Sequence, residues 1–173
     1  MDQIAVDAHA TDNDSGGNVL ANSVGFSLSQ IGSETARQFG HVVGALGLEP
    51  RHFAVLSAVH RHVDRSQQGV GDLLAIPAST MVAIVDHLEH EGLLERRPHP
   101  SDRRARILRL TTRGELLRAQ AQAQAMAQED RICAGLAPRE RAELLALLHR
   151  ISLNLGVSSS ALPDHGSGHR PVP

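Results

Sequence analysis

The sequence GLLERRPHPSDRRARILRLTTRG, at residues 92–114, carries the strongest structural signal in the chain. Two short extended runs occupy residues 93–97 and 106–110. The segment between them is rich in turn residues: Pro98, Pro100, Ser101 and Asp102. Extended runs on either side of such a segment predict a β-hairpin with an irregular tip.

The predicted hairpin is also the most basic part of the chain. The chain has 17 Lys and Arg residues, all of them Arg, against 19 Asp and Glu, so its formal net charge is −2. Residues 95–109 contain only two acids, Glu95 and Asp102, beside six arginines: Arg96, Arg97, Arg103, Arg104, Arg106 and Arg109. Because local clustering matters more than net charge, this patch favours contact with DNA phosphates. A solvated turn is the alternative.

Two helices are predicted near the amino terminus. Apolar residues at helical spacing from Val24 to Leu46 indicate the first, which stops near Gly47. Pro50 opens the second, which is short and amphipathic. Its inner stripe is expected to consist of Phe53, Leu56, Val59 and Val63.

Two further helices are predicted before the hairpin. Ser66 can cap the first of them, although Gly69 and Gly71 inside it each cost roughly 1 kcal/mol relative to Ala. Pro77 opens the second, and Gly92 ends it by adopting a left-handed conformation. Apolar residues of this helix recur at i, i+3, i+4 and i+7: Met81, Ile84, Val85 and Leu88.

Two helices are predicted after the hairpin. Thr111 or Thr112 can cap the first, which extends to about Ala134, and Pro138 opens the second, which reaches Leu155. The last helix has an apolar stripe suited to a partner helix: Leu144, Leu147, Leu148, Ile151 and Leu155. The sequence therefore predicts an all-α fold with a small β-hairpin wing, that is, a winged helix-turn-helix with helical dimerisation arms.

Three segments resemble the core of the MarR family of transcription regulators. They are Gly-Leu-Leu-Glu-Arg-Arg at 92–97, Ser-Asp-Arg-Arg-Ala-Arg at 101–106 and Leu-Thr-Thr-Arg-Gly at 110–114, within a resemblance that covers about residues 24–155. The resemblance implies a homodimeric, non-enzymatic repressor that binds a pseudo-palindromic promoter site. The alternative is a MarR-shaped dimer that binds small molecules, or an anti-regulator, without sequence-specific DNA binding.

The resemblance also implies DNA contacts in the hairpin and in the fourth helix. Asp102 matches an acid that orients an arginine, and Arg104 matches the arginine that enters the minor groove. The fourth helix matches the family's recognition helix, but it has Pro77, Ala78 and Ala83 where the family carries Ser and long polar residues. A bundle helix that reads no bases is the alternative for it. The expected DNA contacts are Ala78, Ser79, Thr80, Ala83, His87, Arg96, Arg97, Asp102, Arg103, Arg104 and Arg106.

The same pattern divides the chain into five segments. Residues 21–47 and 115–155 are expected to form dimerisation helices on either side of the winged helix at 48–114. Residues 1–20 and 156–173 lack hydrophobic periodicity and are expected to be disordered tails. A homodimer is expected because one lobe cannot bury the apolar stripes of the first and last helices.

Other kinds of site find little support. The single cysteine, Cys133, excludes an intramolecular disulfide and is expected to be inert. The pairs His60 with His62 and His87 with His90 lack a further ligand at metal-binding spacing, so solvated or packed imidazoles are expected. No Gly-rich phosphate loop or Gly-x-Ser-x-Gly elbow is present, so we expect neither an enzyme nor a cofactor. An acidic amino terminus without a long apolar run predicts a cytoplasmic protein.

Four cationic or basic residues belong to the elements that wall the family's effector crevice. They are Arg37, His41, Arg51 and His52. Because cations bind carboxylates, these residues are expected to receive a small aromatic or phenolic acid. Ordinary surface residues are the alternative.

Overall fold

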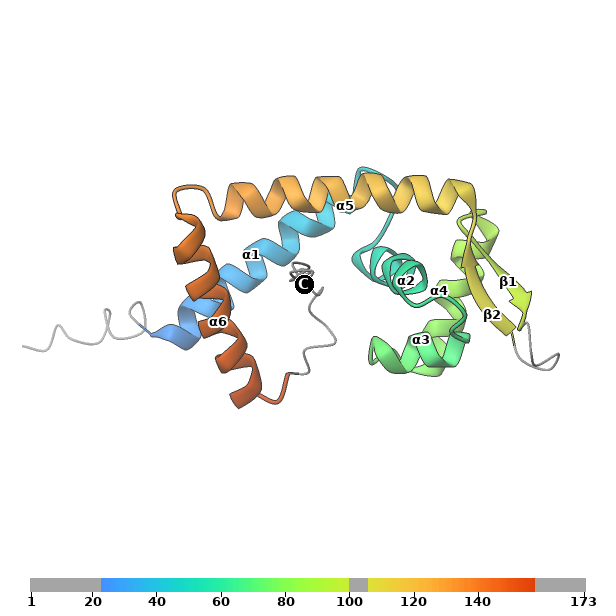
Figure 1. The fold of residues 1–173 in the computed structure, drawn as a ribbon, viewed down its shortest axis with the longest axis horizontal. Helices are drawn as coiled ribbons and strands as arrows, with labels where there is room; N and C mark the ends of the chain where they lie inside the picture. Colours follow the sequence, from blue (N-terminus) through green and yellow to red (C-terminus); the bar gives the residue numbers. More distant parts are fainter. Residues whose placement is uncertain (1–22, 100–105, 158–173) are drawn as a thin grey trace, which may run out of the picture. The chain divides into compact units, whose positions relative to one another are not determined.

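The computed structural model describes residues 23–99 and 106–157, and it confirms the predicted order of helices and strands (Figure 1). The elements are α1 (Val24–Gly44), α2 (Pro50–Arg61), α3 (Gln67–Leu73), α4 (Ala78–His90), β1 (Leu94–Pro98), β2 (Arg106–Leu110), α5 (Thr112–Ile132) and α6 (Pro138–Asn154). β1 and β2 form a two-stranded antiparallel sheet, so the fold class is that of a winged helix. Residues 1–20 and 158–173 of the expected tails lie outside the described part of the chain.

The chain divides into two units, residues 1–38 and 39–173, with the boundary inside α1. In the first unit, the described part of α1 leaves Val24, Phe26 and Ile31 exposed. Among the described residues, no single helix has the length and hydropathy needed to cross a membrane; α3 and α4 reach that threshold only as a pair bent by 117°.

The core of the second unit joins the end of α1 to α2, α3, α4, the hairpin and the first half of α5. Apolar residues at helical spacing place one face of each helix inward, and Leu94 of β1 and Leu108 of β2 are buried in the same core. The largest fully buried side chains are Leu56, Met81, Leu88, Leu94, Leu108, Val43, Val55, Val70 and Val85. In contrast, α6 contains no buried residue.

Four of the predicted helix ends are confirmed. Ser66 Oγ accepts a hydrogen bond from the Gly69 backbone at 3.1 Å, which caps α3. Of the two threonines, Thr111 caps α5 by accepting from the Gly114 backbone at 3.0 Å. Gly92 ends α4 with a φ of +66°, and Pro138 stands in the first turn of α6. These predictions are confirmed because capping depends on local sequence.

Two glycines permit close approach between elements. A Cβ on Gly71 would lie 3.3 Å from the Ile76 oxygen and 3.5 Å from Met81 Cγ, so the glycine allows α3 and α4 to pack tightly. A Cβ on Gly114 would lie 1.8 Å from the Leu93 oxygen. No side chain fits there, because the first turn of α5 rests directly on the backbone at the start of the hairpin.

Two details differ from the sequence prediction. The helix α2 ends at Arg61, and Val63 is 55% exposed, so its expected place on the inner stripe is wrong. The chain leaves the helix here and passes through Asp64, which has a φ of 72°. Pro77 is the extended N-cap of α4 and not its first helical residue. Its fixed φ suits either position.

Candidate nucleic-acid interface

The helix α4 presents an uncharged face over its first two turns. Its inward side is buried through Met81, Ile84, Val85 and Leu88. On the other side the exposed residues are Ala78, Ser79, Val82 and Ala83, while Thr80 is half-buried. Val82 is 44% exposed and was not among the expected DNA contacts. Its position outside the buried i, i+3, i+4, i+7 stripe already predicts that it is exposed.

Later turns of α4 carry the expected contact His87, which is exposed but has a partner within the protein. The His87 ring stacks on the His52 ring with a centroid separation of 4.7 Å and an interplanar angle of 27°. The stack joins the second half of α4 to the first turn of α2. His87 therefore has a packing role beside the phosphate contact expected for it.

His52 is buried, with 5% of its surface exposed. Its Nδ1 accepts a hydrogen bond from the Glu49 backbone N–H at 3.3 Å, which completes a capping box at the start of α2. Burial lowers the pKa of His52, and the neighbouring His87 and Arg51 act in the same direction against Glu49. The neutral imidazole is thus the form that fits this site, because Nδ1 must keep a free lone pair.

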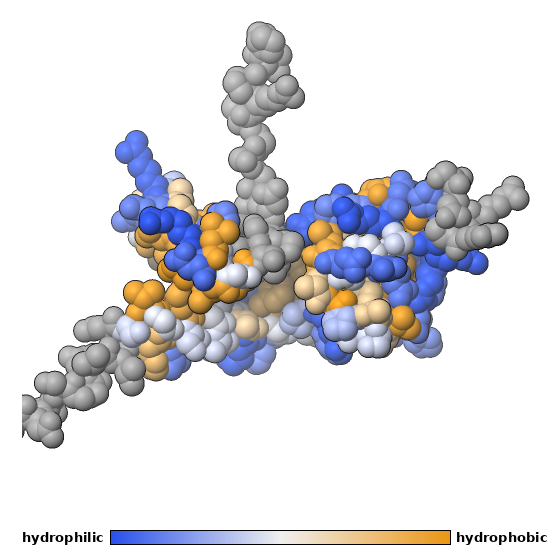
Figure 2. Space-filling model, turned by 90° about the horizontal axis from the view of Figure 1, so that it is seen from below, coloured by the Kyte–Doolittle hydropathy of each residue, from blue (hydrophilic) through white to orange (hydrophobic). Residues whose placement is uncertain are grey.

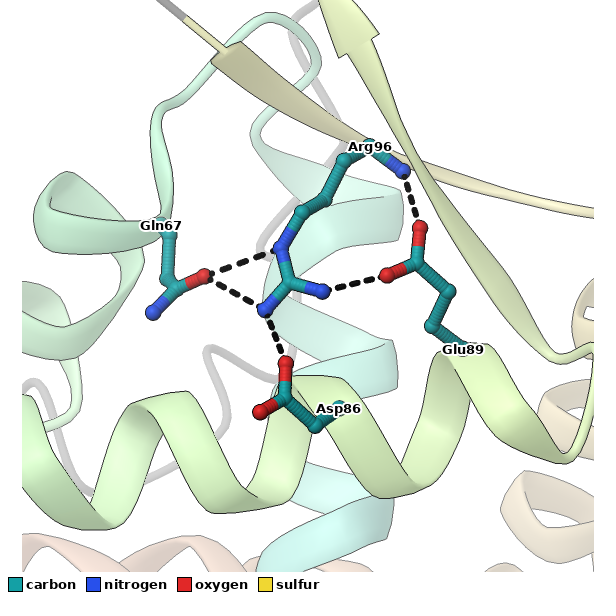
Figure 3. A network of polar contacts seen from close by, with 4 residues as sticks. All are labelled: Gln67, Asp86, Glu89 and Arg96. Carbon is teal, nitrogen blue, oxygen red and sulfur yellow. Dashed lines mark hydrogen bonds and ion pairs between the residues drawn. The ribbon is translucent and has the colours of Figure 1, made fainter.

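Arg96, at the base of the hairpin, lies inside a polar network (Figure 3). Its guanidinium donates to Asp86 Oδ1 at 2.6 Å and to Gln67 Oε1 at 3.1 Å, and it also pairs with Glu89. Its backbone N–H donates to Glu89 Oε1 at 3.1 Å. Asp86 and Glu89 belong to α4 and Gln67 to α3, so one side chain of β1 connects both helices of the helix-turn-helix.

The network gives Arg96 a structural role within the winged helix. The sequence suggested an exposed cation for a phosphate, whereas 26% of the side chain is exposed and its donors already have carboxylate and amide partners. It also compensates the two acids that α4 carries beyond its first two turns. Sequence reasoning missed Gln67, Asp86 and Glu89, although the i, i+3 spacing of the two acids places them on one side of the helix.

The other described arginines of the hairpin differ in their exposure and in their ion pairs. Arg97 is 61% exposed and pairs with Glu95 at 2.6 Å, and Arg106 is exposed at the start of β2. Arg109 pairs with Asp64, which anchors β2 to the segment after α2. Asp102, Arg103 and Arg104 lie outside the described residues.

The four residues expected at an effector site have varied surroundings. Arg37 pairs with Glu34 at 2.6 Å, and Arg51 pairs with Glu49 at 2.6 Å. His41 is exposed, whereas His52 is buried in the capping box. Arg37 belongs to the first unit and the other three to the second.

His60 and Cys133 each have a partner within the protein. His60 Nδ1 lies 2.9 Å from Glu115 Oε2, a contact that joins α2 to α5. Cys133 is buried at the end of α5, where desolvation and the hydrogen bond to Glu129 raise the pKa of its thiol. Within residues 23–99 and 106–157, no group of three or more His, Cys, Asp or Glu side chains could hold a metal ion.

Comparison with known proteins identifies relatives of this arrangement. A model of the MarR family matches residues 46–105. The HTH-type transcriptional regulator MhqR of Bacillus subtilis is 31% identical over 108 residues, which cover 62% of this chain and 74% of that protein.

Two solved structures extend the similarity beyond that segment. A structure of the transcriptional repressor CouR bound to a 23-mer DNA duplex is 33% identical, with a TM-score of 0.69, and covers 79% of this chain and 96% of that chain. CouR from Rhodococcus jostii RHA1 bound to p-coumaroyl-CoA is 28% identical, with a TM-score of 0.66, and covers 86% of this chain and 98% of that chain.

Proposed function

Because this chain belongs to the MarR family of transcription regulators, we propose that it is a non-enzymatic repressor that binds a pseudo-palindromic DNA site as a homodimer. In this proposal α4 enters the major groove and the β1–β2 hairpin reaches the neighbouring minor groove. One observation supports it above the others: an uncharged, exposed helix face stands beside a basic hairpin, and Arg96 ties the two together. The two elements can then bind DNA as one rigid surface.

The tip of the hairpin supplies the minor-groove contact in this proposal. Arg104 inserts between the phosphate backbones, and Asp102 orients its guanidinium. Arg97 and Arg106, exposed on either strand of the described part of the hairpin, add charge near phosphates.

Two-fold symmetry is supported by the apolar surface of α6. All residues of α6 are exposed or half-buried, and among them Leu144 is 42% exposed and Leu148 is 36% exposed. Leu155, just past the end of α6, is 71% exposed. Figure 2 shows apolar surface, in orange, over the part of the molecule that carries α6. A stable homodimer interface buries on the order of 2,000 Å² or more, and such a helix provides part of that area. Each subunit then presents one α4 to one half-site.

An aromatic or phenolic acid is the proposed effector. CouR has been solved with p-coumaroyl-CoA, and in this chain Arg51 and His52 lie at the start of α2, where His52 stacks on His87 of α4. A ligand that displaces His52 therefore acts on α4 through one ring contact. The bound acid would weaken DNA binding by changing the separation of the two α4 helices.

Selection of bound fragments from random duplex DNA tests the DNA-binding proposal. The expected result is enrichment of an inverted repeat whose half-sites are about 34 Å apart. Recovery of no enriched sequence, even at low salt, would contradict it and favour the small-molecule-binding dimer without sequence-specific DNA binding.

Substitutions in the hairpin tip test the contact itself. Arg104→Ala should weaken binding to the selected duplex by about 5- to 150-fold and make the salt dependence shallower by about one. Arg139→Ala, on the exposed surface of α6, is the matched control and should leave both unchanged. Asp102→Ala removes a negative charge near DNA, so tighter binding at two salt concentrations would contradict its orienting role.

Titration with p-coumarate and p-coumaroyl-CoA tests the effector. Either compound should raise the midpoint of thermal unfolding and weaken binding to the selected duplex. A compound that stabilises the protein but leaves DNA affinity unchanged would contradict the regulatory part of the proposal.

A further inference from the structure

The chemistry of α4 restricts how it can identify bases. The helix has the sequence ASTMVAIVDHLEH, with no Arg, Lys, Asn or Gln. Those four residue types make the paired hydrogen bonds that distinguish guanine and adenine in the major groove. The helix therefore lacks the usual means of recognising purines directly.

The exposed polar groups of α4 add little to its base recognition. Ser79 is the one exposed hydroxyl in the first two turns of α4, where a recognition helix contacts base edges. Asp86 belongs to the third turn, and its Oδ1 accepts from Arg96 at 2.6 Å. His87 lies against the His52 ring.

What α4 does expose at its amino-terminal end is methyl groups. Val82 and Ala83 lie side by side in the sequence and both are exposed, with Val82 at 44%. Val82 also borders a shallow hollow between α3 and α4, together with Ala78 and Ile76. An apolar surface that enters the major groove meets one apolar group on the base edges there, the C5 methyl of thymine.

We propose that this protein recognises its DNA site mainly through thymine methyl groups, with Val82 as the principal contact and Ala83 beside it. The inference depends on the proposed function, since it requires α4 to lie in the major groove. It adds the chemical group that α4 recognises. Each half-site must contain thymine opposite the second turn of α4.

Deoxyuridine provides the direct test because it differs from thymidine only by lacking the C5 methyl. Each thymine of the selected duplex is replaced in symmetric pairs, and binding is followed by the anisotropy of labelled DNA. Loss of one buried methyl should weaken binding by about fourfold per half-site, hence by about 15-fold for a symmetric pair. This loss is expected at one or two thymine positions and not at the others.

The protein variants identify which side chain is responsible. In Val82→Ala, binding to the thymine duplex should weaken, and the deoxyuridine effect at the sensitive position should fall to less than about twofold. Val63→Ala is the matched control, because Val63 is 55% exposed outside α4, and it should retain the whole effect. Circular dichroism should confirm that both variants are folded.

The outcomes separate this inference from the function on which it rests. A tightly bound inverted repeat that is insensitive to deoxyuridine at every position, or equally sensitive in Val82→Ala, would overturn the methyl readout but leave the DNA-binding proposal standing. Failure to select any duplex would overturn both.

Discussion

The winged helix buries its apolar side chains within one chain, whereas α6 leaves its apolar side chains uncovered. In the winged helix, α2, α3, α4 and the hairpin turn their apolar residues toward one another, and Leu56, Met81 and Leu88 are fully buried within one chain. The helix α6 has a comparable supply of leucines but buries none of its residues. The winged helix can therefore fold as a single chain, whereas α6 requires a second surface to cover it.

The contrast assigns different tasks to the two regions. A self-contained core holds the hairpin and α4 in a fixed geometry, which DNA recognition requires. An open apolar helix makes association of two chains favourable, and association sets the spacing of two recognition helices. Changes in one region should therefore alter folding, and changes in the other should alter assembly.

The largest effect is expected from charge on the apolar stripe of α6. Leu144→Glu combined with Leu148→Glu should raise the dimer dissociation constant at least about 1,000-fold, because each carboxylate would be buried twice in a symmetric interface. Sedimentation velocity measures this constant. Ala146→Glu, on the opposite face of α6, introduces the same charge and should leave the dimer intact.

The helix content of the double variant shows whether the winged helix folds independently of α6. Its winged helix should stay folded, since its core is complete within one chain. A variant that loses most of its helical circular dichroism signal would show that the two regions are not independent.

A second large effect is expected at Gly114. Gly114→Ala places a methyl group 1.8 Å from the Leu93 oxygen, so α5 must move away from the hairpin. The free energy of unfolding in urea should fall by about 3 kcal/mol or more. Gly69→Ala is the control within the same fold, because its Cβ meets nothing closer than Ser66 Oγ at 3.4 Å. Equal stability of the two variants would contradict the close approach.

A smaller effect should follow removal of the Arg96 guanidinium. Arg96→Ala leaves Asp86 and Glu89 without their cation, and we expect a loss of about 1–2 kcal/mol in unfolding free energy together with weaker DNA binding. Arg97→Ala, which removes a pair that is 61% exposed on the arginine side, should change stability by less than about 0.5 kcal/mol. Similar losses from both would mean that Arg96 has no special role in the winged helix.

The smallest expected effect is a pH dependence that originates at His52. Its pKa is lowered by burial, so below the unfolded pKa of about 6.5 the unfolded chain binds more protons than the folded one. The stability contributed by neutral His52 is complete above that pH and is lost as pH falls through the lowered folded pKa.

Urea titrations between pH 5 and 8 check this prediction. His52→Gln, which keeps a side chain suited to the capping box, should make the decline in stability toward low pH shallower. His149→Gln, exposed on α6, should not change it. An unchanged slope in His52→Gln would assign the pH dependence to other groups.

Features that depend on neighbours in the sequence could be predicted well. The caps at Ser66 and Thr111 and the left-handed Gly92 each follow from a few adjacent residues, and so does the hairpin. Val63 was misplaced because helical spacing continued past the point where the chain leaves the helix.

Features that join distant segments could not be predicted from the sequence. The role of Arg96 depends on Gln67 and Glu89, which reach it only when α3, α4 and β1 pack together. The stack of His52 on His87 likewise joins α2 to α4. A cluster of arginines predicts a basic surface, but it does not indicate which of these arginines form ion pairs within the protein.

The mass of the complex between protein and selected duplex shows whether two chains bind one DNA site. The chain contains neither Trp nor Tyr, so absorbance at 260 nm in a sedimentation experiment follows the DNA almost alone. We expect the saturated complex to exceed the duplex by twice the chain mass of 18.5 kDa, as two chains on one pseudo-palindromic site require. An increase of 18.5 kDa alone, or no complex, would contradict the account of a winged helix brought to DNA in pairs.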